Sequence, residues 1–402
     1  MPLLDRRSLL KLLPGALLAA RAGAAIPGAT RKGRPRELGV RIGRLPAGAW
    51  NAITDVPGVT VGHATIVRGE GPLVVGKGPV RTGVTVVVPA PDRERTLVPC
   101  GVSVPNGNGE LTGLAQARTL GVLGTPIALT NTSSVGMVYA ALTELCRAAG
   151  PGSLEPVVGE TWDGFLNDIE GRHVRHEDVA AALEGARAGP VAEGVVGGGT
   201  GMVCYGFKGG IGTASRRLPE PLAAYTLGAL VQANHGVREE LRIDGVPVGE
   251  AITDLRPEPD EASGGNSILI VLATDAPLLD HQLRRLAARA VHGLARTGSI
   301  SHNGSGDFAL AFSTGNRIPP EAFREGSGYT LASIEQLDLD PLLEAASEAT
   351  EEAIVNALFA AVDVTGRDGR VVRALPIDRT LALLERHHRL FPPQAGPVHA
   401  RS

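Results

Sequence analysis

Short β-branched runs that glycine interrupts alternate with longer helical segments along most of this chain. Segments 58–67 and 80–89, GVTVGHATIV and VRTGVTVVVP, are typical of strands, as is the apolar run that begins at Ser267. Segment 278–297 instead has the 3.6-residue spacing of an amphipathic helix, and 339–362 predicts a second, longer helix. Only 3 % of the residues are aromatic, so Val, Leu, Ile and Ala must build the core. This alternation predicts an α/β fold of layered sheets and helices.

The N-terminus has the features of an export signal. Arg6 and Arg7 precede a short apolar stretch that ends in the small residues Ala22-Gly23-Ala24, a pattern resembling a cleavage site. We interpret residues 1–24 as a twin-arginine signal peptide that directs the chain to a bacterial periplasm, and residues 25–402 as a single domain. A basic, unstructured start is the alternative. The apolar stretch is too short for a bilayer and no other run approaches that length, so no membrane anchor is expected.

Several familiar cofactor and catalytic motifs are absent. Residues 201–206 have the glycine spacing of a phosphate loop, but Phe207 stands where that loop requires lysine. The chain contains neither GxSxG nor HExxH, and its three cysteines form no CxxC pair. His173 and His176 have near-metal spacing, but the charged segment EGRHVRHED predicts an exposed helix start. We therefore expect no metal and no organic cofactor, and the net charge of −3 without a basic block indicates no nucleic-acid partner.

Ser267 stands between a glycine pair and an apolar strand. A serine can be activated without histidine if it is the first residue of a chain, because its own α-amine is then a nearby base. To become a terminus, Ser267 must attack the carbonyl of Asn266 and cut its own chain. Gly264-Gly265 supply the adaptable backbone for that attack, and the strand that follows would hold the new terminus. The alternative is an ordinary loop that enters a strand.

Several longer segments resemble one family in order along the chain. They are TDVPGVTVGHATI, NGNGELTG, LTNTSSVG, VVGETWDGFLNDI, GGGTGMVCYGFKGGIGTASR, GGNSILIVLATDAPLLDHQLRRLAARA and HNGSGDFALAFSTGN. Together they resemble the self-processing serine aminopeptidases, typified by L-aminopeptidase/D-esterase and the β-peptidyl aminopeptidases, over roughly residues 38 to 390. The resemblance implies a layered α/β/β/α sandwich of the type that self-cleaving aminopeptidases share with ornithine acetyltransferases. It also implies autocleavage between Asn266 and Ser267.

The same resemblance assigns catalytic roles beside Ser267. It implies that Ser305 and Asp307, in NGSGDF, are the second serine and the acidic residue near the nucleophile, although part of the family has the longer glutamate there. It also implies that Asn234 donates to the oxyanion. The alternatives are that Ser305 and Asp307 are turn residues, and that Asn234 merely caps the helical stretch that we expect before it.

Two further residues have expected roles in substrate binding. The resemblance implies that Glu160, in GETWDG, receives the substrate's amino group. Glu160 follows the apolar run PVV, where an unpaired carboxylate would be costly, and this favours a functional role. Trp162 stands where some members of the family have a tyrosine that donates to the oxyanion, and its indole N–H is a candidate for that donor.

The predicted protein is a serine aminopeptidase that acts on small peptides or aminoacyl amides through an acyl-enzyme on Ser267. Fragments 25–266 and 267–402 would stay associated, and the heterodimers are expected to assemble further as a homo-oligomer. One alternative is an acyltransferase like ornithine acetyltransferase, whose nucleophile is typically threonine. The other is a non-catalytic binding protein on the same scaffold. Preference among L-α, D-α and β-aminoacyl groups stays open, because pocket-lining residues lie in loops.

Overall fold

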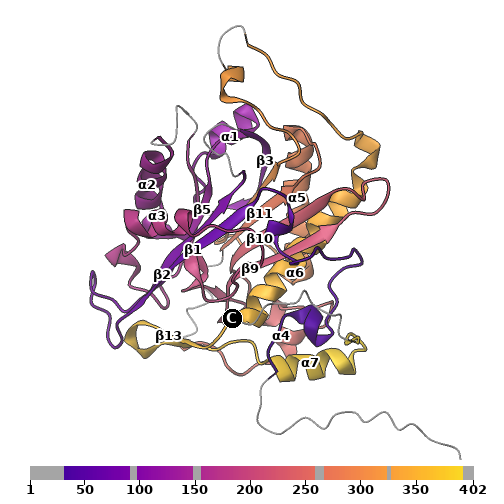
Figure 1. The fold of residues 1–402 in the computed structure, drawn as a ribbon. Coiled ribbons are helices and arrows are strands. Elements are labelled where there is room, and N and C mark those ends of the chain that lie inside the picture. The colour runs from indigo at the N-terminus through magenta and orange to yellow at the C-terminus, as the bar shows by residue number, and fades with distance from the viewer. Residues whose placement is uncertain (1–30, 91–96, 148–154, 259–266, 324–326, 393–402) are drawn as a thin grey trace, which may run out of the picture. The chain divides into compact units, whose positions relative to one another are not determined.

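Two main sheets form the framework of the protein (Figure 1). The computed structural model describes residues 31–90, 97–147, 155–258, 267–323 and 327–392, and the elements below belong to the compact unit that begins at Lys32. The four-stranded sheet has the order β1-β2-β5-β6, with β1 (Thr60–Arg68), β2 (Val80–Val88), β5 (Ile127–Asn131) and β6 (Val157–Thr161). The six-stranded sheet has the order β4-β3-β12-β11-β10-β9, with β3 (Val98–Gly107), β4 (Val122–Leu123), β9 (Gly210–Arg217), β10 (Thr226–Asn234), β11 (Ser267–Thr274) and β12 (Gly306–Ser313).

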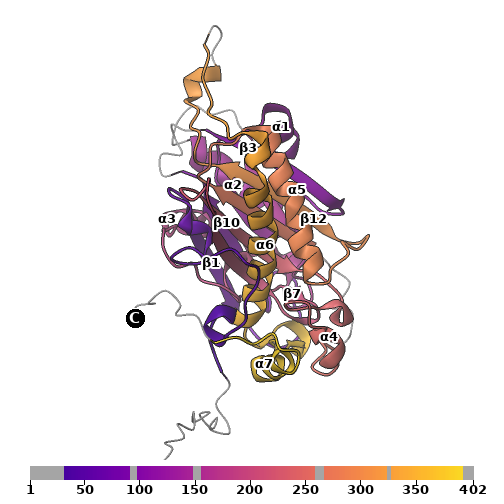
Figure 2. The same cartoon turned by 90° about the vertical axis from the view of Figure 1, so that its right-hand side faces the viewer.

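The described residues also form seven α-helices. They are α1 (Leu114–Leu120), α2 (Val135–Arg147), α3 (His176–Glu184), α4 (Val248–Ala251), α5 (Asp280–Arg296), α6 (Asp340–Ala360) and α7 (Ile377–Arg386). Two short hairpins complete the described elements, β7 (Val203–Cys204) with β8 (Phe207–Lys208) and β13 (Val364–Thr365) with β14 (Val371–Val372). Helices α5 and α6 run side by side over the six-stranded sheet (Figure 2), while α2 and α3 pack on the four-stranded sheet. No helix among the described residues has the length and apolar character that crossing a membrane requires.

Three apolar layers hold these elements together. One lies between the six-stranded sheet and helices α5 and α6, a second between the two sheets, and a third between the four-stranded sheet and helices α2 and α3. Strand β11 contributes to two of them. Its residues Ile268, Ile270 and Leu272 face the helices, whereas Leu269 and Val271 face the other sheet. The architecture is therefore helix, sheet, sheet, helix, and the predicted α/β/β/α sandwich is confirmed.

Most of the expected elements occur at the expected residues. The strands at 60–68, 80–88 and 267–274 and helices α5 and α6 agree with the sequence pattern. The helix expected to end at Asn234 is wrong, because residues 226–234 form the central strand β10. Both faces of this strand are buried, so its small and apolar residues do not alternate with polar ones as those of a half-exposed strand would.

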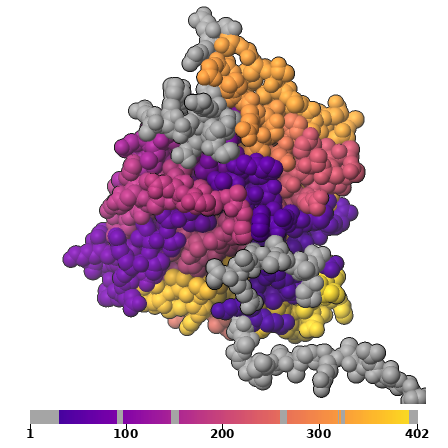
Figure 3. Space-filling model, in the orientation of Figure 1, coloured from indigo at the N-terminus to yellow at the C-terminus, as the bar shows by residue number. Residues whose placement is uncertain are grey.

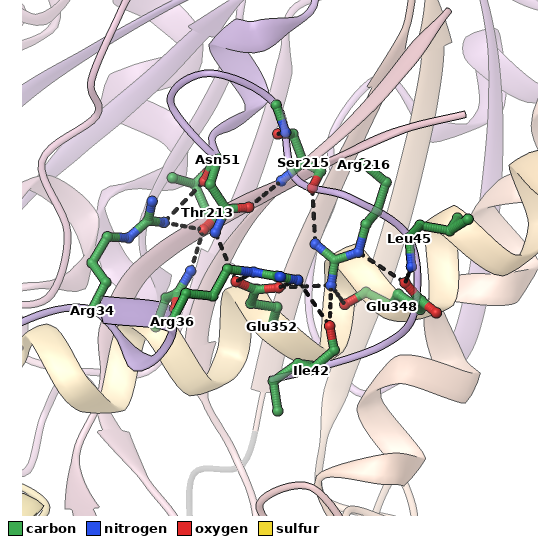
Figure 4. A network of polar contacts seen from close by, with 12 residues as sticks. Arg34, Arg36, Ile42, Leu45, Asn51, Thr213, Ser215, Arg216, Glu348 and Glu352 are labelled. Atoms are coloured by element: carbon green, nitrogen blue, oxygen red, sulfur yellow. Dashed lines mark hydrogen bonds and ion pairs between the residues drawn. The ribbon is translucent and has the colours of Figure 1, made fainter. Parts of the chain in front are cut away.

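Buried ion pairs tie the N-terminal residues and β9 to helix α6 (Figure 4). The guanidinium of Arg216 is fully buried and lies 2.6 Å from a carboxylate oxygen of Glu352 and 2.9 Å from one of Glu348. Arg36 binds both oxygens of Glu352 at 2.6 Å. On one face of the molecule the indigo N-terminal residues lie beside yellow C-terminal ones (Figure 3). Val40 forms a β-bridge with Leu390. The start of the described chain is therefore anchored to its C-terminal part.

We predict that Glu352→Gln lowers the free energy of unfolding by about 3–5 kcal/mol, because it leaves buried guanidinium groups short of a negative partner. Burial alone would raise the pKa of Glu352, but Arg216 and Arg36 together lower it from 4.5 to about 2. The carboxylate therefore stabilises the fold fully above about pH 4.5, and this contribution is lost as the pH falls toward 2. Denaturant unfolding across this range measures both effects. The matched variant Glu344→Gln, which removes the exposed partner of Arg44, should leave the unfolding midpoint unchanged.

Candidate active site

Ser267 is the first residue of β11 and lies between two central strands. In the antiparallel pair β10–β11 it is opposite Asn234, and in the parallel pair β11–β12 it is opposite Gly306. The main-chain N–H of Gly306 donates a hydrogen bond of 3.1 Å to Ser267 Oγ. The side chain is only 6 % exposed. Its hydroxyl is thus held at one end of the sheet by a strand on each side.

Ser305 and Asp307 flank Gly306 at the start of β12. Ser305 Oγ donates to Asp307 Oδ1 at 2.5 Å, and both side chains are buried. Burial raises the pKa of Asp307, and the hydrogen bond from Ser305 opposes that shift. The turn before Ser305 is held by Asn106, whose side-chain amide donates to the carbonyls of residues 302 and 303 at 3.1 Å. The pair is therefore fixed beside Ser267 rather than in a loose turn.

Asn234 ends β10 with its amide group held on both sides. Its Oδ1 accepts from the main-chain N–H of Val203 at 2.7 Å, and its Nδ2 donates to the carbonyl of Trp162 at 3.0 Å. These partners define which end of the amide carries the N–H groups. Trp162 contacts Asn234 through its main chain, while its indole lies against Gly164, where an added Cβ would come within 2.6 Å of the ring.

Glu160 lies in β6, on the sheet that faces the sheet of Ser267. One of its carboxylate oxygens accepts from the main-chain N–H of Glu110 at 3.1 Å, and the other accepts from the hydroxyl of Thr132. Burial raises the pKa of Glu160, and these two hydrogen bonds oppose the shift. Gly109 lies between Glu160 and β12, the strand beside Ser267. A Cβ added at Gly109 would lie 2.8 Å from Glu160 Oε1 and 3.2 Å from Gly306 Cα. Glu160 and Ser267 thus belong to one site, although their strands are in different sheets.

His173 does not match its expected exposed position. Its side chain is buried, with Nε2 2.7 Å from Asp168 Oδ2 and Nδ1 2.7 Å from a guanidinium nitrogen of Arg68. The same Asp168 oxygen accepts from the main-chain N–H groups of Gly76 and Gly78. This histidine therefore braces the turn between β1 and β2. Within the described ranges, no group of three or more His, Cys, Asp and Glu side chains is arranged to hold a metal ion.

Comparison with known proteins decides the family. The model of peptidase family S58 matches residues 51–372. The chain is 46 % identical to beta-peptidyl aminopeptidase BapA from Sphingosinicella microcystinivorans, over 94 % of this chain and 97 % of that protein. This protein belongs to peptidase family S58.

Solved structures agree with that assignment. A Burkholderia sp. beta-aminopeptidase shares 48 % identity with a TM-score of 0.81, and the match covers 88 % of this chain and 98 % of that one. The L-aminopeptidase D-Ala-esterase/amidase from Ochrobactrum anthropi shares 42 % identity with a TM-score of 0.82, over 89 % of this chain and 99 % of the other. That enzyme is described as a prototype for the serine aminopeptidases and a variant of the Ntn hydrolase fold. The prediction of a serine aminopeptidase, a hydrolase acting on N-terminal residues, is confirmed.

The structure brings five of the expected S58 residues into one site. They are Ser267, Ser305, Asp307, Asn234 and Glu160. Trp162 joins them through its carbonyl, and Asn266 lies outside the described residues. Sequence reasoning missed the groups that orient these side chains, namely the Thr132 hydroxyl and the Asn106 amide. Both lie in segments that carry the family resemblance, LTNTSSVG and NGNGELTG, which was the available signal.

Proposed function

We propose that this S58 peptidase cuts its own chain before Ser267 and then uses the new terminal serine to remove β-aminoacyl residues from small peptides and amides. The observation that carries the proposal is the Ser267 hydroxyl, held by the Gly306 N–H between Asn234 and the Ser305–Asp307 pair. The similarity to beta-peptidyl aminopeptidase BapA and to a beta-aminopeptidase supports the β-aminoacyl preference. Any such preference concerns the acyl side of the scissile bond, whose amino group Glu160 would bind.

The first step converts a peptide bond into an ester and then into two termini. Ser267 Oγ attacks the carbonyl carbon of Asn266, the C–N bond breaks, and the nitrogen leaves as the α-amine of Ser267. Water then hydrolyses the ester, which gives a carboxylate on Asn266 and regenerates the hydroxyl. The fragments 25–266 and 267–402 remain associated, because β11 pairs with β10 of the first fragment and the Arg216–Glu352 ion pair spans both.

In the second step the same hydroxyl attacks the substrate. The α-amine of Ser267, with an ordinary pKa of about 7.7, accepts the hydroxyl proton. Ser305 donates its hydrogen bond to Asp307, so its oxygen can accept one from the terminal ammonium and hold it in place. The Asn234 amide donates to the developing oxyanion. The proton returns to the departing amine, and water then hydrolyses the acyl-enzyme and frees the amino acid.

We predict that Ser267→Ala stays a single inactive chain, because the methyl group cannot attack the Asn266 carbonyl. Ser267→Cys should still be cut, since a thiolate is also a nucleophile. Intact-mass spectrometry of the purified proteins measures cleavage, and N-terminal sequencing of the smaller fragment should begin at residue 267. An active enzyme that remains uncut would disprove the terminal-serine mechanism.

Glu160 gives a prediction about the substrate's free amine. A carboxylate with two fixed hydrogen bonds binds an ammonium group by charge-assisted hydrogen bonds, worth roughly 1.5–3 kcal/mol. Glu160→Gln should therefore lower kcat/KM for β-alanyl p-nitroanilide by roughly ten- to a hundredfold. N-acetylated substrate should react comparably slowly with the parent enzyme, while self-cleavage of the variant proceeds normally.

The matched control is Glu110→Gln. Its main-chain N–H, which holds Glu160, is unchanged, and only a nearby negative charge is removed.

The substrates tested should include L- and D-alanyl p-nitroanilides beside the β-alanyl compound. Slower turnover of β-alanyl than of both α-aminoacyl substrates would contradict the β-aminoacyl assignment. Equal kcat/KM for the Glu160→Gln variant and the parent enzyme would exclude Glu160 as the amine anchor.

We also propose export to the periplasm by the twin-arginine route. The support is the sequence alone, Arg6-Arg7 followed by an apolar stretch and Ala22-Gly23-Ala24. Replacing both arginines with lysine should retain the precursor in the cytoplasm, because the receptor reads the guanidinium pair. Cell fractionation with a twin-arginine-deficient host as reference measures this, and an unchanged periplasmic yield of the Lys-Lys variant would rule the route out.

A further inference from the structure

Lys208, the last residue of β8, is a fully buried lysine with a complete set of main-chain acceptors. Its Nζ donates to the carbonyls of Met202 at 2.7 Å, Gly209 at 3.0 Å and Gly199 at 3.1 Å. Burial lowers the pKa of Lys208 to about 7. The neutral amine, however, has only two N–H groups for three carbonyls, whereas the ammonium has three, so this hydrogen-bond set favours the charged form.

One of those acceptors connects Lys208 to the active site. The carbonyl of Met202 and the N–H of Val203 belong to the same peptide unit, and that N–H donates to Asn234 Oδ1 at 2.7 Å. Hydrogen bonds in such a chain polarise one another. A cation at the carbonyl end makes the Val203 N–H a stronger donor, and a stronger bond to Oδ1 makes the Asn234 N–H groups stronger donors in turn.

The same contacts set the orientation of the Asn234 amide. A rotated Met202–Val203 peptide would turn its carbonyl away from Lys208 and its N–H away from Asn234. A flipped Asn234 side chain would put its amino group against the Val203 N–H, two donors face to face. The observed arrangement satisfies these partners and leaves Nδ2 on the side of Trp162.

We infer that Lys208 is a positioning residue for the oxyanion donor, acting on Asn234 through the single peptide unit between Met202 and Val203. The inference rests on the proposed function, in which the Asn234 amide stabilises the oxyanion on the substrate carbonyl. Because the developing charge exists only in the transition state, loss of Lys208 should lower kcat and leave KM nearly unchanged.

The test is a double-mutant cycle between Lys208→Met and Asn234→Ala. Rates are normalised to the amount of chain cut before Ser267, so that a defect in processing does not count as a defect in turnover. Lys208→Met should lower kcat for β-alanyl p-nitroanilide by about tenfold, less than the roughly 10²–10³-fold loss expected when the donor itself is removed. In the Asn234→Ala background, the same substitution should change kcat by less than about twofold.

Arg238→Met is the matched control. Arg238 is another buried cation that binds the same hairpin, and it donates to the carbonyls of Tyr205 at 2.8 Å and Gly206 at 2.6 Å. Its removal should lower the thermal midpoint, but its effect on kcat should be the same with and without Asn234. Lys208→Gln, which is neutral and keeps N–H donors, is the milder variant to use if Lys208→Met does not fold.

The outcomes separate this inference from the proposed function. If Asn234→Ala leaves kcat unchanged, Asn234 is not the oxyanion donor. That result would overturn both this part of the proposed mechanism and the inferred role of Lys208. If Asn234→Ala lowers kcat but Lys208 variants act additively with it, only the role of Lys208 is overturned. Failure of both Lys208 variants to fold would assign the lysine to the scaffold and also overturn the inference.

Discussion

The register of three central strands determines where every reactive group of this site lies. Ser267 is opposite Asn234 on one side and Gly306 on the other, so a shift of one residue would replace the serine with Ile268. Both faces of β11 are apolar, so hydrophobic burial alone opposes such a shift only weakly. Polar contacts at the opposite end of β11 also oppose a register shift. There, Thr274 Oγ1 donates to the Thr226 carbonyl at 2.8 Å. The geometry at the nucleophile thus depends on hydrogen bonds a strand length away.

A close approach of the two sheets brings Glu160, the proposed amine-binding group, toward Ser267. Leu269 of β11 packs against Gly159 of β6, where an added Cβ would lie 2.8 Å from its side chain. This contact places the next residue, Glu160, beside Gly109. Gly109 in turn lies against Gly306 of β12, the residue paired with Ser267. The main chain of Glu110 and the Thr132 hydroxyl offset part of the cost of burying the carboxylate. The proposed amine anchor is therefore held in place before substrate arrives, which is what positional discrimination requires.

Sequence patterns could predict the elements of this fold better than the contacts that orient the site. The glycine pair and the strand after it made Ser267 a candidate, because chain cleavage needs both an adaptable and a rigid neighbour, and the family resemblance favoured this candidate over a loop residue. Asn234 lies opposite Ser267. It was wrongly expected on a helix, since the small residues of TLGALVQAN fit either element. His173 looked exposed among charged residues, whereas its partners Asp168 and Arg68 come from separate segments. The role of Lys208 depends on three main-chain carbonyls. Every residue has such a carbonyl, so no sequence pattern predicts these contacts.

The proposed cut before Ser267 is compatible with a stable site, because strand pairs and ion pairs among the described residues join the two fragments independently of the bond that would break. The fragment that begins at Ser267 keeps β11, β12, α5 and α6, and β11 stays hydrogen-bonded to β10 of the other fragment. Helix α6 packs on β9 and β10 and holds Arg216 and Arg36 through Glu352. The terminus that the proposed cut would create is therefore a strand residue with fixed neighbours on both sides. The amine of a terminal serine is always three bonds from its own hydroxyl, so the strand is not needed to bring them together. Its contribution is to hold both groups in a fixed direction toward the place where a substrate carbonyl would bind.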